Sequence, residues 1–580
     1  MKKKNEVTQF KGLPPVEGPL TRFEAERTTI LKSVESFSLS SLEDPAETRI
    51  DAPIEAMISE ACHQEHLRMQ RLKRTSPSYM WNLPRHIRDQ VLWKSVRRSL
   101  KKRETEGRER ELLAKIVHHY VREIGGHFDP KVYDFTTRMT PFLFNWLLNA
   151  AAARQFSPWK TQSLLESRLR IQGNLDHFQR LSKLGTVILV PTHQSNIDSL
   201  LIGYVIYLLM LPPFAYGAGL NLFTNPVLGF FMSNLGAYTV DRLKSNELYK
   251  HVLKAYSTEI IRRGVHSVFY PGGGRSRNGA IETKLKLGLL GTGLRAQIER
   301  LKSGEPNAGV YIVPMVTSYE FVFEALSLIE DYLARLGEHR FLGADTEEAL
   351  PVAKMVKWAW KFFSLESKIT VRIGKPMDVF GNLVDESGRS IGPNGTTIDP
   401  KRWLTTNGEL RPDEARDSQY TRLLGEKIVD SYYRNNTVLS AHLLAFSFFS
   451  ALRKRYPDLD LFRLLRLTLA QRSIPYDDFV KTAAEMHELV QERAVRGELV
   501  LCEELTRMNV ETWIKDGLRG LGVLHDHGVV RVENGVVWTE DMNLLYYYRN
   551  RLTGYGMVPA TERGRLRILR GEPDEKGFLV

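Results

Sequence analysis

Short apolar runs alternate with helical patterns across the middle of the chain. Four such runs are rich in β-branched and aromatic residues and have the length of strands: 186–190, 265–270, 310–316 and 369–373. Between the first two, residues 245–263 carry apolar side chains at helical spacing, and Gly264 follows as a typical helix end. Alternating strands and helices predict an α/β domain over 181–380, with a mixed sheet flanked by helices.

The pattern changes on both sides of this domain. We predict four flanking regions: a polar, poorly ordered lead (1–54), a helical N-terminal region (55–180), a linker or insertion (381–420) and a helical C-terminal region (421–580). The linker is rich in Gly, Pro, Asn and Asp and has little apolar periodicity. A hairpin is predicted near the end of the chain, because Asn534 and Gly535 supply the positive backbone angles of a tight turn.

Three apolar runs are long enough to be considered for membrane contact: 141–153, 200–211 and 439–452. None approaches the roughly 20 apolar residues that span a bilayer. We expect the second and third runs to be buried helices. The first has an aromatic face followed by basic residues, so it is the candidate for lying in a membrane interface.

Composition narrows the class of protein. The chain has 580 residues, 42% of them hydrophobic, which is typical of a globular protein with more than one domain. A net charge of +13 favours an anionic partner, either phospholipid, a phosphate-bearing substrate or nucleic acid. The two cysteines have no metal-ligand spacing, so we expect neither a metal site nor a disulfide framework. The polar N-terminus has no signal-peptide core.

A histidine and a carboxylate lie five positions apart just after the first apolar run. His193 and Asp198 predict a general base with an orienting partner, the arrangement that activates hydroxyl groups. Histidine suits this role because its pKa is about 6.5 in model peptides. The alternative is a helix start in which Ser195 is the cap and Asp198 completes a capping box, leaving His193 as a loop residue.

The loop at 271–277 has the chemistry to bind an anion. Its consecutive glycines let the backbone approach a ligand closely. Arg275 and Arg277 can form bidentate hydrogen bonds with phosphate oxygens. An ion-paired turn is the alternative for the arginines, and Ser276 either binds phosphate or caps the turn.

Four segments occur in an order that is similar to the four blocks of the glycerolipid acyltransferase superfamily: 193–198, 236–242, 271–277 and 310–316. The third block and residues 547–550 resemble the larger glycerol-3-phosphate and dihydroxyacetone-phosphate acyltransferases. The resemblance is strong over 185–380 and implies acyl transfer from a thioester to a hydroxyl. It implies His193 as general base, Asp198 as its partner, and substrate contacts from Arg242, Gly273, Gly274, Arg275, Ser276, Arg277 and Pro314.

The chain departs from this family pattern at two positions. Gly272 stands where the third block normally has a glutamate, and Thr239 stands where the second block often has a phenylalanine. The missing glutamate bears on acceptor binding. Glu282 and Glu320 are the nearest residues in sequence that could supply the carboxyl group.

The leading hypothesis is an acyltransferase that acts on the sn-1 hydroxyl of glycerol 3-phosphate in phospholipid synthesis. The alternatives are a 1-acylglycerol-3-phosphate acyltransferase, a catalytically impaired membrane-associated homologue, and a winged-helix nucleic-acid binder formed by the C-terminal region. We expect acyl-CoA or acyl carrier protein as co-substrate, no other cofactor, no metal and no nucleic acid. An anionic membrane surface is the expected partner, bound peripherally at the cytoplasmic face.

Overall fold

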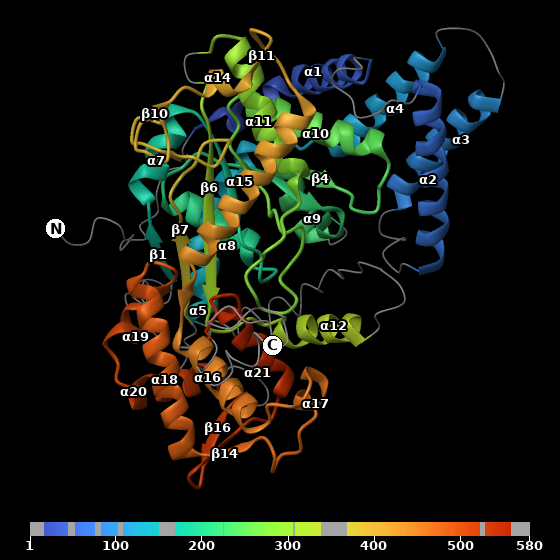
Figure 1. Cartoon of the computed structure of the whole chain (residues 1–580). Helices are drawn as coiled ribbons and strands as arrows, with labels where there is room; N and C mark the ends of the chain where they lie inside the picture. Colours follow the sequence, from blue (N-terminus) through green and yellow to red (C-terminus); the bar gives the residue numbers. More distant parts are fainter. Residues whose placement is uncertain are drawn as a thin grey trace, which may run out of the picture.

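A mixed seven-stranded sheet lies at the centre of the chain (Figure 1). The computed structural model describes residues 17–43, 53–75, 83–101, 108–149, 169–223, 226–305, 308–337, 368–522 and 528–557. In spatial order the strands are β1 (Leu169–Gly173), β7 (Ile369–Ile373), β6 (Val310–Tyr319), β2 (Thr186–Pro191), β5 (Ser267–Val268), β3 (Ala215–Gly219) and β4 (Ala237–Val240). The predicted α/β class with a mixed sheet is confirmed.

Five of the strands are parallel, and the other two run against them. β6 pairs with β2 in parallel from Thr186↔Val310 to Pro191↔Met315, and β3, β4 and β5 continue this direction. β7 pairs antiparallel with the last part of β6, and β1 is parallel to β7. The pairing with β7 explains why β6 extends beyond the predicted run. β1, β3 and β4 have no extended apolar run, and sequence analysis missed them.

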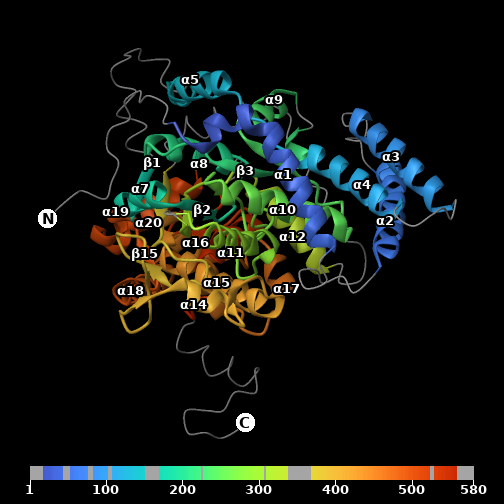
Figure 2. The same ribbon diagram turned by 90° about the horizontal axis from the view of Figure 1, so that it is seen from above.

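Helices cover both faces of this sheet. They are α7 (Leu175–Leu184), α8 (Asp198–Leu208), α9 (Pro226–Asn234), α10 (Glu247–Arg262) and α11 (Leu287–Lys302), with the short η3 (Leu220–Phe223). α12 (Ala325–Gly337) lies beyond the strand ends and packs against the C-terminal region. α8 leads across the sheet in one direction, and α10 and α11 lead back. Right-handed crossovers therefore place α8 on one face and α10 and α11 on the other, as Figure 2 shows.

The N-terminal region is helical from an earlier point than predicted. It contains η1 (Pro19–Arg22), α1 (Phe23–Glu43), α2 (Ile54–Thr75), α3 (Leu83–Lys101), α4 (Arg108–Ile124) and α5 (Pro130–Asn149). α1 corrects the prediction of a poorly ordered lead over 1–54. Its Ile30 and Val34 are buried, and Ser33 and Ser41 bond to Glu259 and His251 of α10 at 2.8 Å each. The serines make this helix look polar in sequence, although they bind another helix.

A buried ionic network joins the N-terminal helices to the end of β4. Arg68 of α2 pairs with Asp89 of α3 at 2.6 Å and with Asp241, which follows β4, at 3.2 Å. Lys244 is fully buried and pairs with Asp89 at 3.3 Å and with Glu123 of α4. Each partner in the network neutralises a charge that would be costly to bury alone. The network therefore holds the segment after β4 against the helical region.

The region after the sheet begins with short strands rather than an irregular linker. The predicted linker at 381–420 contains β8 (Leu383–Val384), β9 (Ser390–Ile391), β10 (Thr397–Ile398), α14 (Pro400–Leu404), β11 (Thr405–Thr406) and β12 (Glu409–Leu410), and then α15 (Glu414–Arg434) begins. β8, β9 and β10 form a small antiparallel sheet. The turn residues seen in sequence therefore connect strands that are too short to give a periodic pattern.

The C-terminal region is a helical layer, as expected. Its elements are β13 (Thr437–Val438), α16 (Ser440–Arg455), α17 (Leu461–Leu465), β14 (Ser473–Pro475), α18 (Tyr476–Val495), β15 (Val500–Leu501), α19 (Glu503–Arg507), α20 (Val510–Gly522), β16 (Arg531–Glu533), β17 (Val536–Trp538), α21 (Met542–Arg549) and η4 (Asn550–Leu552). α16 packs against α18, α20 and α21. β16 and β17 form the predicted hairpin, with Asn534 at φ 51° and Gly535 at φ 74°.

Two of the three long apolar runs form buried helices. The runs at 200–211 and 439–452 belong to α8 and α16, and both helices are largely buried, as predicted. The side chains of the interfacial candidate at 141–153 lie outside the described residues. Within the part of the chain that the structure describes, every helix is too short or too polar to cross a membrane.

Candidate active site

His193 and Asp198 lie at the carboxyl end of β2, where the chain turns into α8. His193 Nδ1 is 2.8 Å from Asp198 Oδ2. The Asp198 side chain is completely buried, and that of His193 is 16% exposed. A carboxylate at Nδ1 favours the tautomer that carries its proton there. Nε2 has no hydrogen-bond partner among the described residues, so this nitrogen is the one available to accept a proton.

Asp198 organises the loop that carries His193. Its Oδ2 also accepts the backbone N–H groups of Gln194 and Ser195 at 2.7 and 2.9 Å. α8 begins at Asp198 with Ile197 before it, and no side chain caps this helix start. Ser195 Oγ instead donates to Glu324 Oε2 at 2.9 Å. The Asp198 half of the capping-box alternative is thus present, whereas Ser195 forms no side-chain cap at the start of α8. Asp198 also contacts His193 directly, so His193 is not left as an isolated loop residue.

Two tyrosines, the buried Tyr319 and the partly buried Tyr270, complete the surroundings of this pair. The Tyr319 hydroxyl, at the end of β6, donates to the second carboxylate oxygen of Asp198. The Tyr270 ring stacks on the His193 imidazole with 4.1 Å between centroids and 22° between planes. Burial raises the pKa of both tyrosines well above 10, so their hydroxyl groups stay neutral. Tyr319 thus donates to the carboxylate, and Tyr270 fixes the plane of the imidazole.

The glycine-rich loop at 271–277 lies directly against the histidine loop. The Ser276 N–H donates to the His193 carbonyl oxygen at 2.7 Å. Gly273 has φ +76°, a left-handed conformation that favours glycine. The Ser276 hydroxyl donates to the Ala280 carbonyl at 2.7 Å. Ser276 therefore caps the turn with its side chain, while its backbone joins the two loops.

Both arginines of this loop have carboxylate neighbours. Arg275 Nη1 is 3.5 Å from Glu324 Oε1, and Arg277 Nε is 3.0 Å from Asp331 Oδ2 on α12. Glu324 also accepts the Asn196 N–H at 2.9 Å, and burial raises the pKa of Glu324. The ion-paired alternative is thus present in the structure. A guanidinium has five N–H donors, so an ion pair does not by itself prevent an arginine from binding an anion.

Glu282 lies beside the position where the family glutamate is missing. A Cβ on Gly272 would be 3.0 Å from Glu282 Cγ and 3.2 Å from Oε1. Oε1 accepts the His193 N–H at 2.8 Å, whereas Oε2 is buried and has no hydrogen-bond partner. Burial raises the pKa of Glu282 to about 7. Glu320, the other candidate, accepts the Lys368 N–H at 3.0 Å and approaches Gly520 of α20 instead.

Arg242 and Pro314 lie at a greater distance from this centre. Arg242 is exposed and follows β4, at the same sheet edge as the end of β2. β5 and β3 separate β2 from β4, so strand spacing places Arg242 roughly 14 Å from the histidine loop. Pro314 is buried in the middle of β6, opposite Val190, and its carbonyl accepts the Gly374 N–H at 2.8 Å. Pro314 therefore lies within a strand and not at its end. The substrate contacts of Arg242 and Pro314 stay predictions.

The C-terminal helix α21 and the following η4 contact every loop of the site. Tyr548 OH accepts the Val322 N–H at 3.0 Å, and Asn550 Nδ2 donates to the Asn278 carbonyl at 2.9 Å. Arg551 is 2% exposed and donates to the Thr317 carbonyl at 2.8 Å. Its guanidinium also lies against the Gln194 side chain. Burial lowers the pKa of Arg551, and no described carboxylate is within ion-pair distance of it.

Several of these residues gave no signal in the sequence. Tyr319, Glu324 and Arg551 approach the histidine loop from positions more than 100 residues away in the chain, and none belongs to a recognised spacing. Residues 547–550 were noted for their family likeness, and that likeness is the one signal that led toward Arg551. The fold and the site together define a histidine–carboxylate centre facing an arginine loop at the carboxyl edge of an α/β sheet.

Comparison with known proteins identifies the class. The acyltransferase family model matches residues 173–318, which contain the histidine loop, the arginine loop and most of the sheet. Over these residues the chain is similar to the acyltransferase family, in agreement with the resemblance to the glycerolipid acyltransferase superfamily described above.

The relatives are bacterial glycerol-3-phosphate acyltransferases. The chain is 26% identical over 393 residues to the enzyme of Pseudomonas fluorescens strain Pf0-1, covering 67% of this chain and 40% of that protein. It is 27% identical over 309 residues to the enzyme of Pseudomonas aeruginosa strain PAO1, covering 52% of this chain and 33% of that protein. The similarity to the Pseudomonas putida KT2440 enzyme is 26% over 390 residues, with 67% and 40% covered. The chain thus spans 40% or less of the length of these relatives.

Proposed function

We propose that the chain transfers a fatty acyl group from a thioester donor to the sn-1 hydroxyl of glycerol 3-phosphate. The observation that carries this proposal is the His193–Asp198 pair, with a free Nε2, beside an arginine-containing loop. A base that faces an anion-binding loop suits an acceptor that has both a hydroxyl and a phosphate. The names of the relatives, all glycerol-3-phosphate acyltransferases, support the same acceptor.

The reaction follows from the geometry of the pair. His193 Nε2 takes the proton of the acceptor hydroxyl while the oxygen attacks the thioester carbonyl. Asp198 stabilises the imidazolium through Nδ1, and its other donors keep the carboxylate in place. The tetrahedral intermediate then collapses, the carbon–sulfur bond breaks, and the thiolate takes the proton back from His193. The acceptor hydroxyl is the nucleophile, so the chain forms no acyl-enzyme.

Electrostatic groups around the pair are arranged for a phosphate. Arg275 and Arg277 offer the guanidinium donors, and Glu324 positions Arg275. Glu282 brings a carboxyl group to the position beside Gly272, where it can accept or donate a hydrogen bond at neutral pH because its pKa is about 7. This carboxyl group supports an active enzyme over a catalytically impaired homologue. Acylation of 1-acylglycerol 3-phosphate at its second hydroxyl is the alternative within the same mechanism.

We also propose that the protein works at the surface of an anionic membrane, on the cytoplasmic side. The net charge of +13 favours such a surface, and the product would be an amphipathic lipid. Acyl-CoA and acyl carrier protein are both thioester donors that fit the reaction. No other cofactor enters the mechanism.

An acceptor panel tests this function. Purified full-length chain is incubated with long-chain acyl-CoA or acyl carrier protein and with glycerol 3-phosphate, dihydroxyacetone phosphate or 1-acylglycerol 3-phosphate. Thiol release and the lipid product are measured together. We expect thiol release that depends on glycerol 3-phosphate and yields the sn-1 acyl product. Turnover with 1-acylglycerol 3-phosphate alone would select the alternative acceptor, and acceptor-independent thiol release would contradict the proposal.

A further inference from the structure

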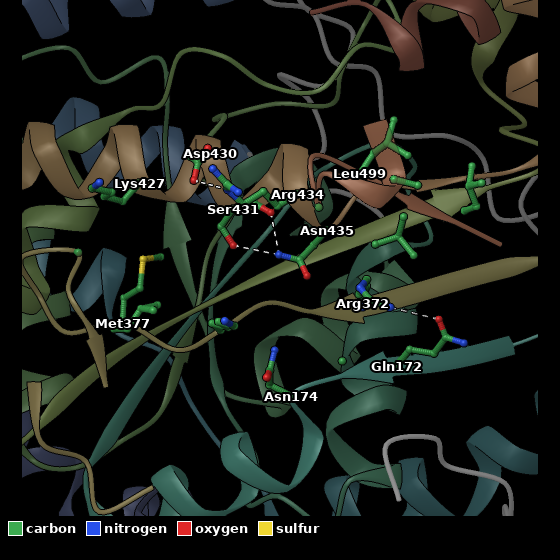
Figure 3. A pocket seen from close by; sticks show the side chains of 18 of the residues that line it. Gln172, Asn174, Arg372, Met377, Lys427, Asp430, Ser431, Arg434, Asn435 and Leu499 are labelled. Atoms are coloured by element: carbon green, nitrogen blue, oxygen red, sulfur yellow. Dashed lines mark hydrogen bonds and ion pairs between the residues drawn. The ribbon is translucent and has the colours of Figure 1, made fainter. Parts of the chain in front are cut away.

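A cavity of about 1470 Å³ opens between the sheet edge and the C-terminal layer. Its walls are the carboxyl ends of β1 and β7, the last turns of α15 and the segment around β15 (Figure 3). None of its lining residues belongs to the histidine loop, the arginine loop or α21. The cavity is therefore separate from the candidate active site and has no role in the mechanism above.

The charge of this cavity is positive and incompletely neutralised. Arg372 of β7 lines it, with Nη1 3.4 Å from Gln172 Oε1 and with a buried Nε that has no hydrogen-bond partner. Lys375 and Lys427 also line it, and neither forms an ion pair with a described residue. In contrast, Arg434 is paired with Asp430 at 2.8 Å. Three cations thus line one space without a described carboxylate partner, although two carboxylates, Asp430 and Glu503, line it too.

Arg372 is the least satisfied of these groups. Burial lowers the pKa of its guanidinium, because no opposite charge compensates the loss of water around it. A buried donor without a partner is costly, and native proteins seldom keep one unless something else binds it. A ligand with phosphate groups in the cavity would supply an acceptor for Nε and counter-charge for the cations along its walls.

The remaining walls indicate more than a bare ion. Leu383, Leu499 and Leu501 supply apolar surface, whereas Ser431 and Asn435 supply polar groups (Figure 3). The volume greatly exceeds that of inorganic phosphate and lies in the range of sites for small organic ligands or above it. We propose that this cavity binds an organic phosphate, with Arg372, Lys375 and Lys427 around the phosphate and the leucines against its uncharged part.

The position of the cavity connects it to the active site through one helix. Tyr432 lies between Ser431 and Asn435 on α15, and its hydroxyl donates to the Val190 carbonyl at 3.0 Å. Val190 is three residues before His193. The phosphate can come from the nucleotide part of an acyl-CoA donor or from a separate phosphorylated metabolite. Only the acyl-CoA source rests on the proposed function.

Calorimetric titration of the full-length chain at low salt tests the site. The probes are inorganic phosphate, adenosine 3′,5′-bisphosphate and coenzyme A. We expect saturable binding of adenosine 3′,5′-bisphosphate, with inorganic phosphate weaker. Arg372→Gln and Lys427→Gln should each weaken it about tenfold or more, because each removes a charge-assisted contact. The control Arg463→Gln replaces a 75% exposed arginine and should change nothing, and His193→Ala should also bind normally.

The binding results distinguish the two sources of the phosphate and can also overturn the proposed site. Coenzyme A binding that Arg372→Gln weakens equally assigns the site to the donor nucleotide, and adenosine 3′,5′-bisphosphate binding that coenzyme A cannot displace assigns it to a separate metabolite. Lys427 is exposed, so its variant is expected to stay folded and remains informative if Arg372→Gln does not fold. The absence of saturable binding by any probe overturns the proposal. So does binding that persists in both variants, or binding that is lost in Arg275→Gln alone.

Discussion

Replacing Glu282 by glutamine should raise the free energy of unfolding, measured against the parent, more at alkaline pH than at acid pH. Burial raises the pKa of Glu282 from its ordinary value near 4.5 to about 7. The folded state therefore binds this proton more tightly than the unfolded state does. The stability that Glu282 contributes is complete below pH 4.5 and is lost as the pH rises through about 7. Glutamine cannot ionise, and it keeps an acceptor for the His193 N–H.

The size of the effect follows from the two pKa values. Each pH unit between them corresponds to about 1.4 kcal/mol, so ionisation of the buried carboxyl costs at most about 3.5 kcal/mol. Because the unfolded carboxyl is already mostly ionised at pH 5, the difference between pH 5 and pH 8 should be about 2.5 kcal/mol. The free energy of unfolding of Glu282→Gln, compared with that of the parent, should therefore rise by this amount from pH 5 to pH 8.

Urea unfolding at pH 5 and pH 8 measures this difference as a free energy of unfolding. The matched control is Glu426→Gln, which changes an exposed glutamate on α15. Its effect on stability should be the same at both pH values. If Glu282→Gln also changes the free energy of unfolding equally at pH 5 and pH 8, the carboxyl group is not buried as described, and its assignment beside Gly272 fails.

Further predictions concern the same site and its surroundings. Gly272→Glu should lower both activity and stability, because its Cβ would meet Glu282 Cγ at 3.0 Å. The double variant Gly272→Glu/Glu282→Ala should recover at least about tenfold in activity. A single variant that is fully active in steady-state assays would contradict this prediction. Arg551→Gln should lower kcat about tenfold or more with little change in KM, because Arg551 supports the loops without reaching substrate. Arg551→Lys should retain more activity. An unchanged kcat in an Arg551→Gln protein of normal thermal stability would refute this role of Arg551. In flotation experiments the protein should bind anionic liposomes and leave them in high salt, whereas failure to float removes the membrane proposal.

The sequence predicted the parts of the fold that have a strong local period. The runs at 186–190 and 310–316 became β2 and β6 because central strands are buried on both faces and are therefore continuously apolar. α10 was predicted from its spacing and from Gly264, which has φ +81°. α1 was missed, because its serines bond to another helix and that partner cannot be recognised from local sequence.

In the candidate site, too, the residues that are close in sequence were predicted and the distant ones were not. His193 and Asp198 are five residues apart, so one turn of chain brings them together, and their spacing with the order of the four blocks favoured the contact over the helix-cap alternative. Arg551 reaches the site through packing of the whole C-terminal layer, which no local pattern encodes. Glu282 was a candidate by proximity in sequence, and its side chain packs against Gly272, whereas Glu320 approaches Gly520.

The central claim is that His193 is the base for acyl transfer to a phosphorylated acceptor. The most direct measurement is the rate of incorporation of radiolabelled glycerol 3-phosphate into lipid by His193→Ala, with His118→Ala as a control histidine that is 49% exposed and lies on α4. With circular dichroism showing that both variants are folded, the account predicts a loss of at least about 10²–10⁴-fold for His193→Ala and parent-like activity for His118→Ala. Parent-like incorporation by His193→Ala would contradict it.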